Sequence, residues 1–124
     1  MTADNTRLVR DYLEIVWNQG RTSQAATLVA EDLVQHNRTL PDGRQALVDH
    51  VDAARQAMPD LRFDVKRTIA QDDLVVAHSS FTAAGGAVAL VVIDIYRVEN
   101  GRIAEHWDAA EQVPDSPVGG RSVF

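Results

Sequence analysis

Hydrophobic positions in the first half of the chain recur with a helical period. Over residues 4–18 they fall every three or four positions, which predicts an amphipathic helix. A shorter helix is expected over about 22–30, and a third over 43–58, where Pro59 ends it. The stretch "EDLVQHN" between the second and third helices is too short to form a helix of its own. We expect it to run as an extended arm into the interior.

After Pro59 the pattern changes from helical to alternating. Apolar and polar residues alternate in four segments, which read "LRFDVKRTIA", "LVVAHSSFTA", "AVALVVIDIYRV" and "RIAEHWDAAEQV". Short turns separate them, and Asn100-Gly101 is the strongest turn signal because a two-residue hairpin loop needs positive φ at both positions. Helices followed by a meander of antiparallel strands predict an α+β fold, in which the helices cover one face of a curved sheet.

Composition narrows the classes of protein that fit this pattern. With 124 residues and 45% hydrophobic content, the chain suffices for one core, so a single domain over residues 1–124 is expected. The net charge is −6 and the 12 basic residues are scattered, which disfavours binding to nucleic acid or an anionic membrane. There is no cysteine for a disulfide or a thiolate metal site. The N-terminus lacks a signal-peptide pattern and no window reaches the length of a membrane span, so a soluble, cytoplasmic protein is expected.

Four polar residues interrupt apolar stretches: His36, His78, Asp94 and Asp108. A buried carboxylate without a partner is costly, so Asp94 must be solvated, hydrogen-bonded or neutralised by a raised pKa. If these groups converge in a cavity, they supply a proton acceptor and a differently perturbed proton donor, as acid–base chemistry requires. Structural roles compete with this interpretation. Asp94 alone fits an edge position paired with a basic residue, and each histidine fits a core position bonded to a backbone carbonyl.

Other chemistries find little support in the sequence. No two histidines have metal-ligand spacing, so no metal is expected. No glycine-rich phosphate loop opens a helix, and the serines of "HSSF" lack the tight elbow of a nucleophile. His50 is assigned to the surface or to a subunit contact, with no chemistry. Trp17 and Trp107 are expected in the core or in the wall of a pocket.

A resemblance to a known family rests on longer stretches. "VQHN", "PDGRQALVDHV", "MPDLRFDVKR", "LVVAHSSF", "VIDIYRVENGRIAEHWDAAEQVP" and the terminal "SVF" resemble the SnoaL-like branch of the nuclear transport factor 2-like superfamily, from about Val9 to Phe124. The hairpin "DIYRVENGRIAEHWD" is the most specific part. The resemblance implies a cone-shaped fold, with N-terminal helices packed in a strongly curved antiparallel sheet around a pocket, and a homodimer formed through the sheet. The family's named members are polyketide cyclases that close a ring by intramolecular aldol condensation without metal or cofactor, and relatives on the same fold isomerise steroids or hydrolyse epoxides.

The resemblance also assigns residues to roles. It places the cyclases' acid–base aspartate on Asp108, and it places Asp94 where the cyclases carry a histidine. His36 and His78 resemble the "QHN" and "VxHS" positions of uncharacterised relatives. We therefore expect Asp108, Asp94 and His36 to be catalytic. The residues expected to bind substrate are His78, Trp107, His106, Trp17 and Tyr12.

Strand geometry sets a condition on this site. With Asn100-Gly101 as a two-residue turn, an unbroken ladder would place Asp94 opposite Trp107 and turn Asp108 to the other face of the sheet. Both carboxylates enter one cavity only if the last strand contains a bulge between about Ala104 and Asp108. On the analogy with the family, we expect this bulge.

The leading functional hypothesis is a cofactor-independent acid–base enzyme, of the aldol cyclase or isomerase type, acting on a small apolar carbonyl compound. Asp108 would remove a C–H proton, while Asp94, His36 or His78 would orient the carbonyl or donate to the developing enolate oxygen. Two alternatives stay open: a non-catalytic ligand-binding or accessory dimer module, and a hydrolase of a small epoxide. Each implies a small hydrophobic ligand.

Overall fold

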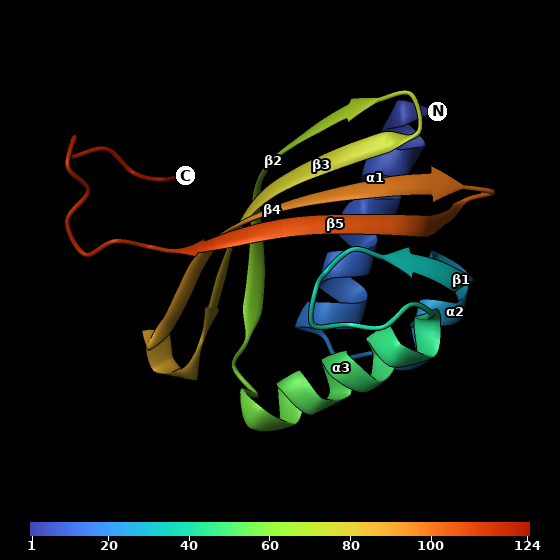
Figure 1. The fold of residues 1–124 in the computed structure, drawn as a ribbon, viewed down its shortest axis with the longest axis horizontal. Helices are drawn as coiled ribbons and strands as arrows, with labels where there is room; N and C mark the ends of the chain where they lie inside the picture. Colours follow the sequence, from blue (N-terminus) through green and yellow to red (C-terminus); the bar gives the residue numbers. More distant parts are fainter.

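A curved five-stranded sheet is the framework of the molecule. The computed structural model describes residues 1–124, and the strands lie in the order β1-β5-β4-β3-β2 (Figure 1). The strands are β1 (Val29–Gln35), β2 (Arg62–Gln71), β3 (Leu74–Ala83), β4 (Val88–Glu99) and β5 (Arg102–Gln112). The meander β2 to β5 is antiparallel, as predicted. The segment predicted to be an extended arm is a strand, β1, which pairs parallel to β5, so the sheet is mixed.

Three helical segments surround the concave face. The first consists of α1 (Thr2–Tyr12) and a π-helical continuation, η1 (Leu13–Asn18), where a single α-helix over 4–18 was expected. The helix predicted over 22–30 is shorter: a 3-10 turn, η2 (Thr22–Gln24), leads into α2 (Ala25–Leu28), and the chain then enters β1. The third, α3 (Arg44–Ala57), agrees with the predicted 43–58 to within one residue at each end. None of these helices has the length and apolar character needed to cross a bilayer.

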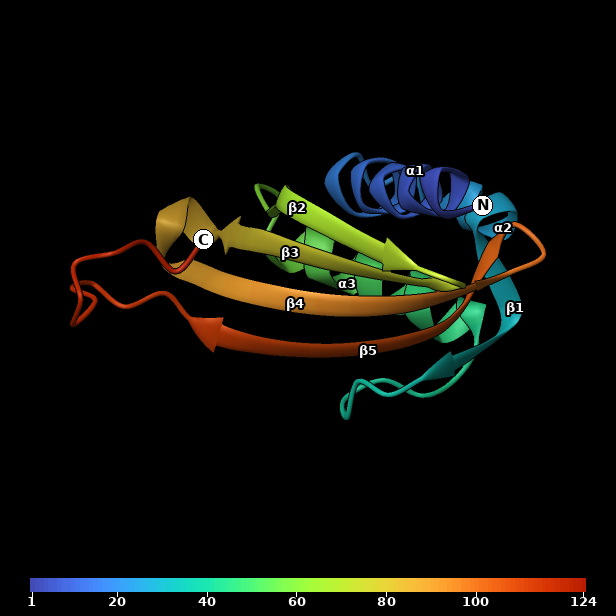
Figure 2. The ribbon, with the colours of Figure 1, turned by 90° about the horizontal axis from the view of Figure 1, so that it is seen from above.

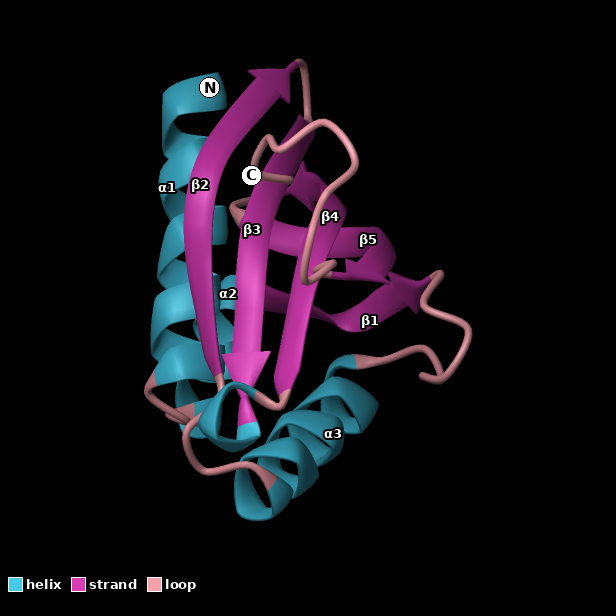
Figure 3. Cartoon of the chain, turned by 90° about the vertical axis from the view of Figure 1, so that its left-hand side faces the viewer, coloured by secondary structure: helices cyan, strands magenta, loops and turns pink.

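The helices and the sheet form a cone around an apolar core. The α1 helix packs along β2 and β3, whereas α3 lies across the open end beside β1 (Figures 2 and 3). Burial of these apolar faces supplies most of the stability of such an arrangement. The largest fully buried side chains of this core are Leu13, Leu33, Ile103, Val9 and Val16. The predicted α+β cone is therefore confirmed.

The hairpin between β4 and β5 contains both predicted features. Asn100 and Gly101 have φ values of 53° and 73°, the positive values that a two-residue hairpin loop needs. Val98 pairs with Ile103 but Arg97 pairs with Glu105, so one residue of β5, Ala104, has no partner on β4. This is the expected bulge, and it shifts the rest of the ladder by one residue. As a result, Asp94 pairs with Asp108 and both side chains face the concave side.

Candidate functional site

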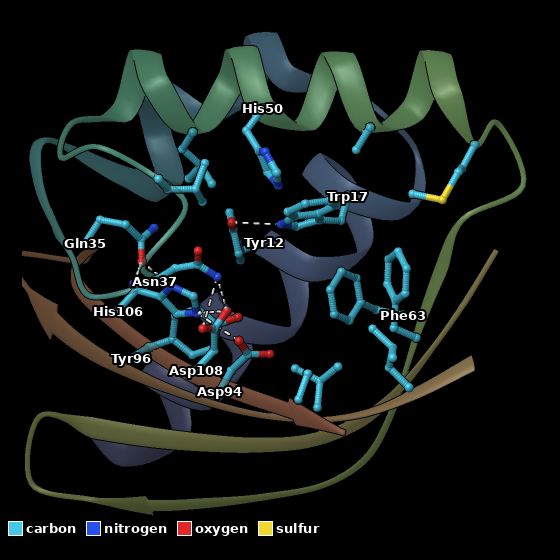
Figure 4. Close-up of a pocket in the computed structure, with 18 residues that line it drawn as sticks. Tyr12, Trp17, Gln35, Asn37, His50, Phe63, Asp94, Tyr96, His106 and Asp108 are labelled. Atoms are coloured by element: carbon cyan, nitrogen blue, oxygen red, sulfur yellow. Dashed lines mark hydrogen bonds and ion pairs between the residues drawn. The ribbon is translucent and has the colours of Figure 1, made fainter. Parts of the chain in front are cut away.

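A cavity of about 270 Å³ lies between the concave face of the sheet, η1 and α3. One side is apolar, and polar groups gather at the other end, against β4 and β5 (Figure 4). The apolar wall includes Trp17, Met58, Phe63, Phe81, Leu90 and Val92. The polar end is formed by Gln35, Asn37, Asp94, His106 and Asp108. An apolar pocket with a few convergent polar groups is the usual form of a small-molecule site.

His106 is the centre of the polar end. Its Nδ1 lies 2.8 Å from Gln35 Oε1, and its Nε2 lies 2.8 Å from Asp94 Oδ1. The same Gln35 oxygen accepts a hydrogen bond from the backbone N–H of Asn37, so this atom is an acceptor and His106 Nδ1 must carry a hydrogen. The hydrogen bond between His106 Nε2 and Asp94 Oδ1 needs a second proton, which these two atoms share.

Asp94 is buried, with 3% of its surface exposed. Burial raises the pKa of its carboxyl group, and the nearby charge of Asp108 raises it further. The hydrogen bond and charge of His106, and the nearby hydroxyl group of Tyr96, act in the opposite direction. The second oxygen, Oδ2, is buried without a hydrogen-bond partner. A carboxylate oxygen in this position is costly, so the surroundings favour the protonated form of Asp94.

Asp108 has a more polar environment than Asp94. Asn37 Nδ2 lies 3.1 and 2.9 Å from its two carboxyl oxygens. Asn37 Oδ1 accepts from the backbone N–H of Thr39, which identifies Nδ2 as the atom that faces Asp108. Asp108 Oδ2 also lies 4.0 Å from His106 Nε2. Two carboxyl groups with different surroundings thus lie side by side, the arrangement that assigns one as acid and the other as base.

Tyr12 brings a hydroxyl group to the cavity from the helical side. Trp17 Nε1 donates to Tyr12 Oη at 2.9 Å, so the phenolic oxygen already accepts one hydrogen bond and retains its own hydrogen to donate. Burial is the main cause that raises the pKa of Tyr12, which keeps the phenol neutral. The π-helical turn that follows Tyr12 positions Trp17, whose ring packs edge-on against Phe63 at 5.3 Å.

Five of the eight predicted site residues line this cavity: Asp94, Asp108, His106, Trp17 and Tyr12. The other three lie on the convex face of the sheet. Trp107 follows His106 on β5, so the bulge that turns His106 and Asp108 inward turns Trp107 outward. Placing Trp107 in the pocket wall was therefore wrong.

The two remaining histidines have structural partners on that convex face. His36 Nε2 lies 2.7 Å from Glu105 Oε2, and the imidazole stacks on Trp107 with ring centroids 4.8 Å apart. His78 contacts Arg67 on β2, and its ring lies 6.1 Å from that of Phe124. Neither residue lines the cavity, so the catalytic assignment of His36 and the binding assignment of His78 find no support in the geometry.

Four cavity residues with polar groups were not predicted from the sequence: Gln35, Asn37, His50 and Tyr96. The alternation of an extended chain would have identified two of them, because Gln35 and Asn37 lie on the same side as the core residue Leu33, whereas His36 lies on the opposite side. His50 on α3 was assigned to the surface, but its ring points into the cavity and packs edge-on against Trp17 at 5.8 Å (Figure 4). Burial lowers the pKa of His50, which favours the neutral imidazole.

A cation would find its ligands at the same polar end. One ligand atom from each of Asp94, His106 and Asp108 lies within 4.8 Å of the others. Oxygen and imidazole ligands suit several divalent metals. In this structure, however, His106 Nε2 and Asp94 Oδ1 already form a hydrogen bond with each other. The expectation that the protein works without a metal stays a prediction.

Comparisons with known proteins agree with this architecture. The sequence matches the family model of the SnoaL-like polyketide cyclases over residues 7–114. No curated protein matches it significantly. TsrD from Streptomyces laurentii has a similar structure, with a TM-score of 0.79, 20% identity and 90% of each chain covered.

Two further solved structures share the fold. IdmH, a putative polyketide cyclase from Streptomyces antibioticus, is 20% identical, with a TM-score of 0.74 over 86% of this chain and 91% of that chain. An LEH-like epoxide hydrolase from M. tuberculosis is 18% identical, with a TM-score of 0.75 over 89% of this chain and 84% of that chain. The structural likeness supports the fold, and the family model covers most of the sequence. The chain therefore belongs to the SnoaL-like polyketide cyclase family.

Proposed function

We propose that this protein is a cofactor-independent acid–base enzyme that acts on a small, largely apolar carbonyl compound. The observation that carries the proposal is the pairing of Asp94 and Asp108 on neighbouring strands, both facing one cavity, with His106 between them. Their surroundings differ, because Asp94 is buried with one unpartnered oxygen while Asp108 accepts from an amide. One group is suited to hold a proton and the other to accept one.

Asp108 is the base in this proposal. Its carboxylate removes a proton from the carbon next to the substrate carbonyl, and the electron pair of the C–H bond moves to the carbonyl oxygen to form an enolate. The Tyr12 hydroxyl, whose oxygen already accepts from Trp17, donates a hydrogen bond to that oxygen. A donor aimed at the developing negative charge stabilises the transition state more than the ground state.

Asp94 and His106 complete the reaction as the acid. In an aldol closure, the enolate carbon attacks a second carbonyl carbon of the same molecule, and the new alkoxide takes the proton shared by His106 and Asp94. Asp108, now protonated, returns its proton to that pair over the 4.0 Å that separates it from His106 Nε2. In an isomerisation, Asp108 delivers its proton to another carbon of the enolate. Both routes conserve protons without a cofactor.

Epoxide hydrolysis is a second candidate that the same groups can support. The Asn37 amide and the Asp108 carboxylate lie within hydrogen-bond distance of each other, and together they offer a donor and an acceptor to one water molecule. Asp108 would take a proton from this water as the water oxygen bonds to a ring carbon. The bond between that carbon and the epoxide oxygen would break as the oxygen takes the proton held by Asp94 and His106. The similar structure of an LEH-like epoxide hydrolase makes this class worth testing beside the carbonyl compounds.

The test is an activity screen against β-dicarbonyl compounds, enones and small epoxides. We expect turnover of a carbonyl substrate that falls by about 10²–10⁴-fold in Asp108→Asn, a range typical of a lost general base. Glu111→Gln removes the same charge from an exposed position on the same strand and serves as the control. Activity that is unaffected by Asp108→Asn would remove Asp108 from the mechanism. Turnover of epoxides alone would support hydrolysis, and ligand binding without turnover of any class would support the binding-module alternative.

The homodimer through the sheet remains a prediction. Its support is the convex face, where Ile93 is 39% exposed and Trp107 and His36 stack on each other. Apolar groups in the middle of an exposed sheet face suit a contact between two copies of the chain. The cytoplasmic location is likewise a prediction.

A further inference from the structure

The polar end of the cavity carries a net negative charge. No lysine or arginine lines the cavity, whereas Asp94 and Asp108 both do. His106 Nδ1 holds one proton, and a second is shared between His106 Nε2 and Asp94 Oδ1. With Asp108 as a carboxylate, the three groups sum to a charge of −1 whether the shared proton lies on the imidazole or on Asp94. His50, the other titratable base in the lining, is disposed to be neutral by its burial.

We propose, on the basis of the function proposed above, that this cavity selects uncharged ketones or enones with one or two rings and excludes their carboxylate analogues. An anionic group at the polar end would lie beside the charge of Asp108 and would find no cation to compensate for its lost hydration. A carbonyl oxygen needs only a hydrogen-bond donor there, and the Tyr12 hydroxyl supplies one. The apolar end, with Trp17 and Phe63, takes the ring.

The volume of the cavity limits the size of the ligand. A cavity of about 270 Å³ lies just below the range of about 300–1,000 Å³ that is typical of sites for drug-sized ligands. It therefore suits a smaller compound, with one ring or two fused rings and a short side chain. A larger fused ring system would extend out of the cavity into solvent.

Two compounds of the same shape test the charge selection. Benzylacetone is an uncharged methyl ketone, and hydrocinnamate is its carboxylate counterpart, in which an oxygen anion replaces the methyl group. Trp17 lines the cavity and Trp107 does not, so Trp107→Phe leaves a single indole that reports on binding. The intrinsic fluorescence of this variant is titrated with each compound near neutral pH, and calorimetry on the wild type checks the result.

We expect benzylacetone to give a saturable change in Trp17 emission and hydrocinnamate to bind at least about 30-fold more weakly, because its charge faces Asp108 in a site of low polarity. In Asp108→Asn the difference between the two compounds should shrink by about tenfold or more, whereas Glu111→Gln should keep the wild-type difference.

Equal affinity for the two compounds, or no binding of benzylacetone, would overturn the inference. So would an identical difference in Asp108→Asn and Glu111→Gln. If Asp108→Asn does not fold, the wild-type comparison alone decides. Failure of the proposed function gives a different result. If benzylacetone binds more tightly than hydrocinnamate, but the protein turns over no compound of the substrate screen, the proposed catalysis is overturned and this inference stands.

Discussion

Asp94 on β4 and Asp108 on β5 are direct cross-strand partners, and their carboxyl groups share the neighbourhood of one imidazole, that of His106. Like charges directly opposite each other in a sheet are destabilising. A proton held between Asp94 and His106 removes part of this repulsion, while Asn37 stabilises the charge on Asp108. The pairing of Asp94 with Asp108 therefore destabilises the fold, and a role of the two carboxyl groups in acid–base chemistry would explain why they are paired.

The Asp94→Asn variant should remove a pH-dependent loss of stability. Burial raises the pKa of Asp94 in the folded protein, so above the ordinary pH range of an aspartate the unfolded chain releases this proton while the folded chain retains it. The free energy of unfolding of the wild type then falls by up to about 1.4 kcal/mol per pH unit until the folded pKa is reached. Asparagine has no proton to release, so urea denaturation should show the variant gaining stability relative to the wild type as the pH rises from 4 to 7.

Asp60→Asn is the matched control with the opposite sign. Asp60 accepts hydrogen bonds from the backbone N–H groups of Ala84 and Gly85, which lower the pKa of its carboxyl group. The stabilisation that it provides is therefore present above the ordinary pH range of an aspartate and is lost as the pH falls through the lowered value. Relative to the wild type, this variant should be less stable near neutral pH and similar in acid. The same pH trend in both variants would contradict the assignment of Asp94.

The sequence was sufficient for most of the fold because the signals involved are local. Period-2 alternation located β2 to β5, Pro59 ended α3, and Asn100-Gly101 fixed the hairpin. The parallel pairing of β1 with β5 joins residues about 70 positions apart, and no local pattern encodes it. The π-helical turn after Tyr12 was missed for a related reason, since its apolar residues fit an ordinary helix equally well.

The site was only partly predictable. The sequence identified Asp94 and Asp108, but the face that each side chain occupies depends on a single extra residue, Ala104. The bulge followed from the family analogy and not from the residues. The prediction of Trp107 as a pocket residue was inconsistent with the predicted bulge. Neighbours in a strand face opposite sides of the sheet, so a bulge that turns Asp108 toward the cavity turns Trp107 away from it. The prediction that His36 is catalytic finds no support in the geometry for the same reason, since Gln35 and Asn37 on either side of it line the cavity and His36 does not.

Deletion of Ala104 should test the role of the bulge. In the deletion variant Ile103 is followed directly by Glu105, so the ladder continues unbroken with the pairs of the wild type, and Asp94 still lies opposite Asp108. The cavity face of β5 should therefore be kept. The loss of the buried Ala104, and of the twist that a bulge adds, should lower the free energy of unfolding by about 1–3 kcal/mol. Ala109→Gly, a change on the same strand outside the bulge, serves as a control. NMR contacts between β4 and β5 that place Asp94 opposite Trp107 in the deletion variant would contradict the assigned register.

Gln35 should fix the tautomer of His106. In the wild type, nitrogen-15 spectra of the histidine side chains should show a hydrogen on Nδ1 of His106, because Gln35 Oε1 accepts there. Gln35→Leu removes the acceptor for two donors and should cost about 1–3 kcal/mol of stability, with a shift of the hydrogen toward Nε2. Gln35→Glu keeps an acceptor oxygen and should keep the hydrogen on Nδ1. A tautomer that is the same in all three proteins would contradict the role of Gln35.

The oligomeric state has a direct test on the convex face. Light scattering should give a mass about twice the 13.6 kDa of one chain. Ile93→Glu places a charge on the exposed centre of β4, where Ile93 is 39% exposed, and should yield a monomer with unchanged circular dichroism. Arg38→Glu, which changes an exposed loop residue, should leave the mass unchanged. A monomeric wild type would contradict the predicted dimer.

The central claim is that Asp94 holds a proton beside the basic Asp108, and carbon-13 NMR of the aspartate side chains tests it most directly. The carboxyl resonance of Asp94, assigned by comparison with Asp94→Asn, should titrate above the ordinary range of an aspartate because the group is buried. Its midpoint should fall in Asp108→Asn, which removes the neighbouring negative charge. A carboxyl group of Asp94 that titrates at or below the ordinary aspartate value would contradict the assignment of acid and base.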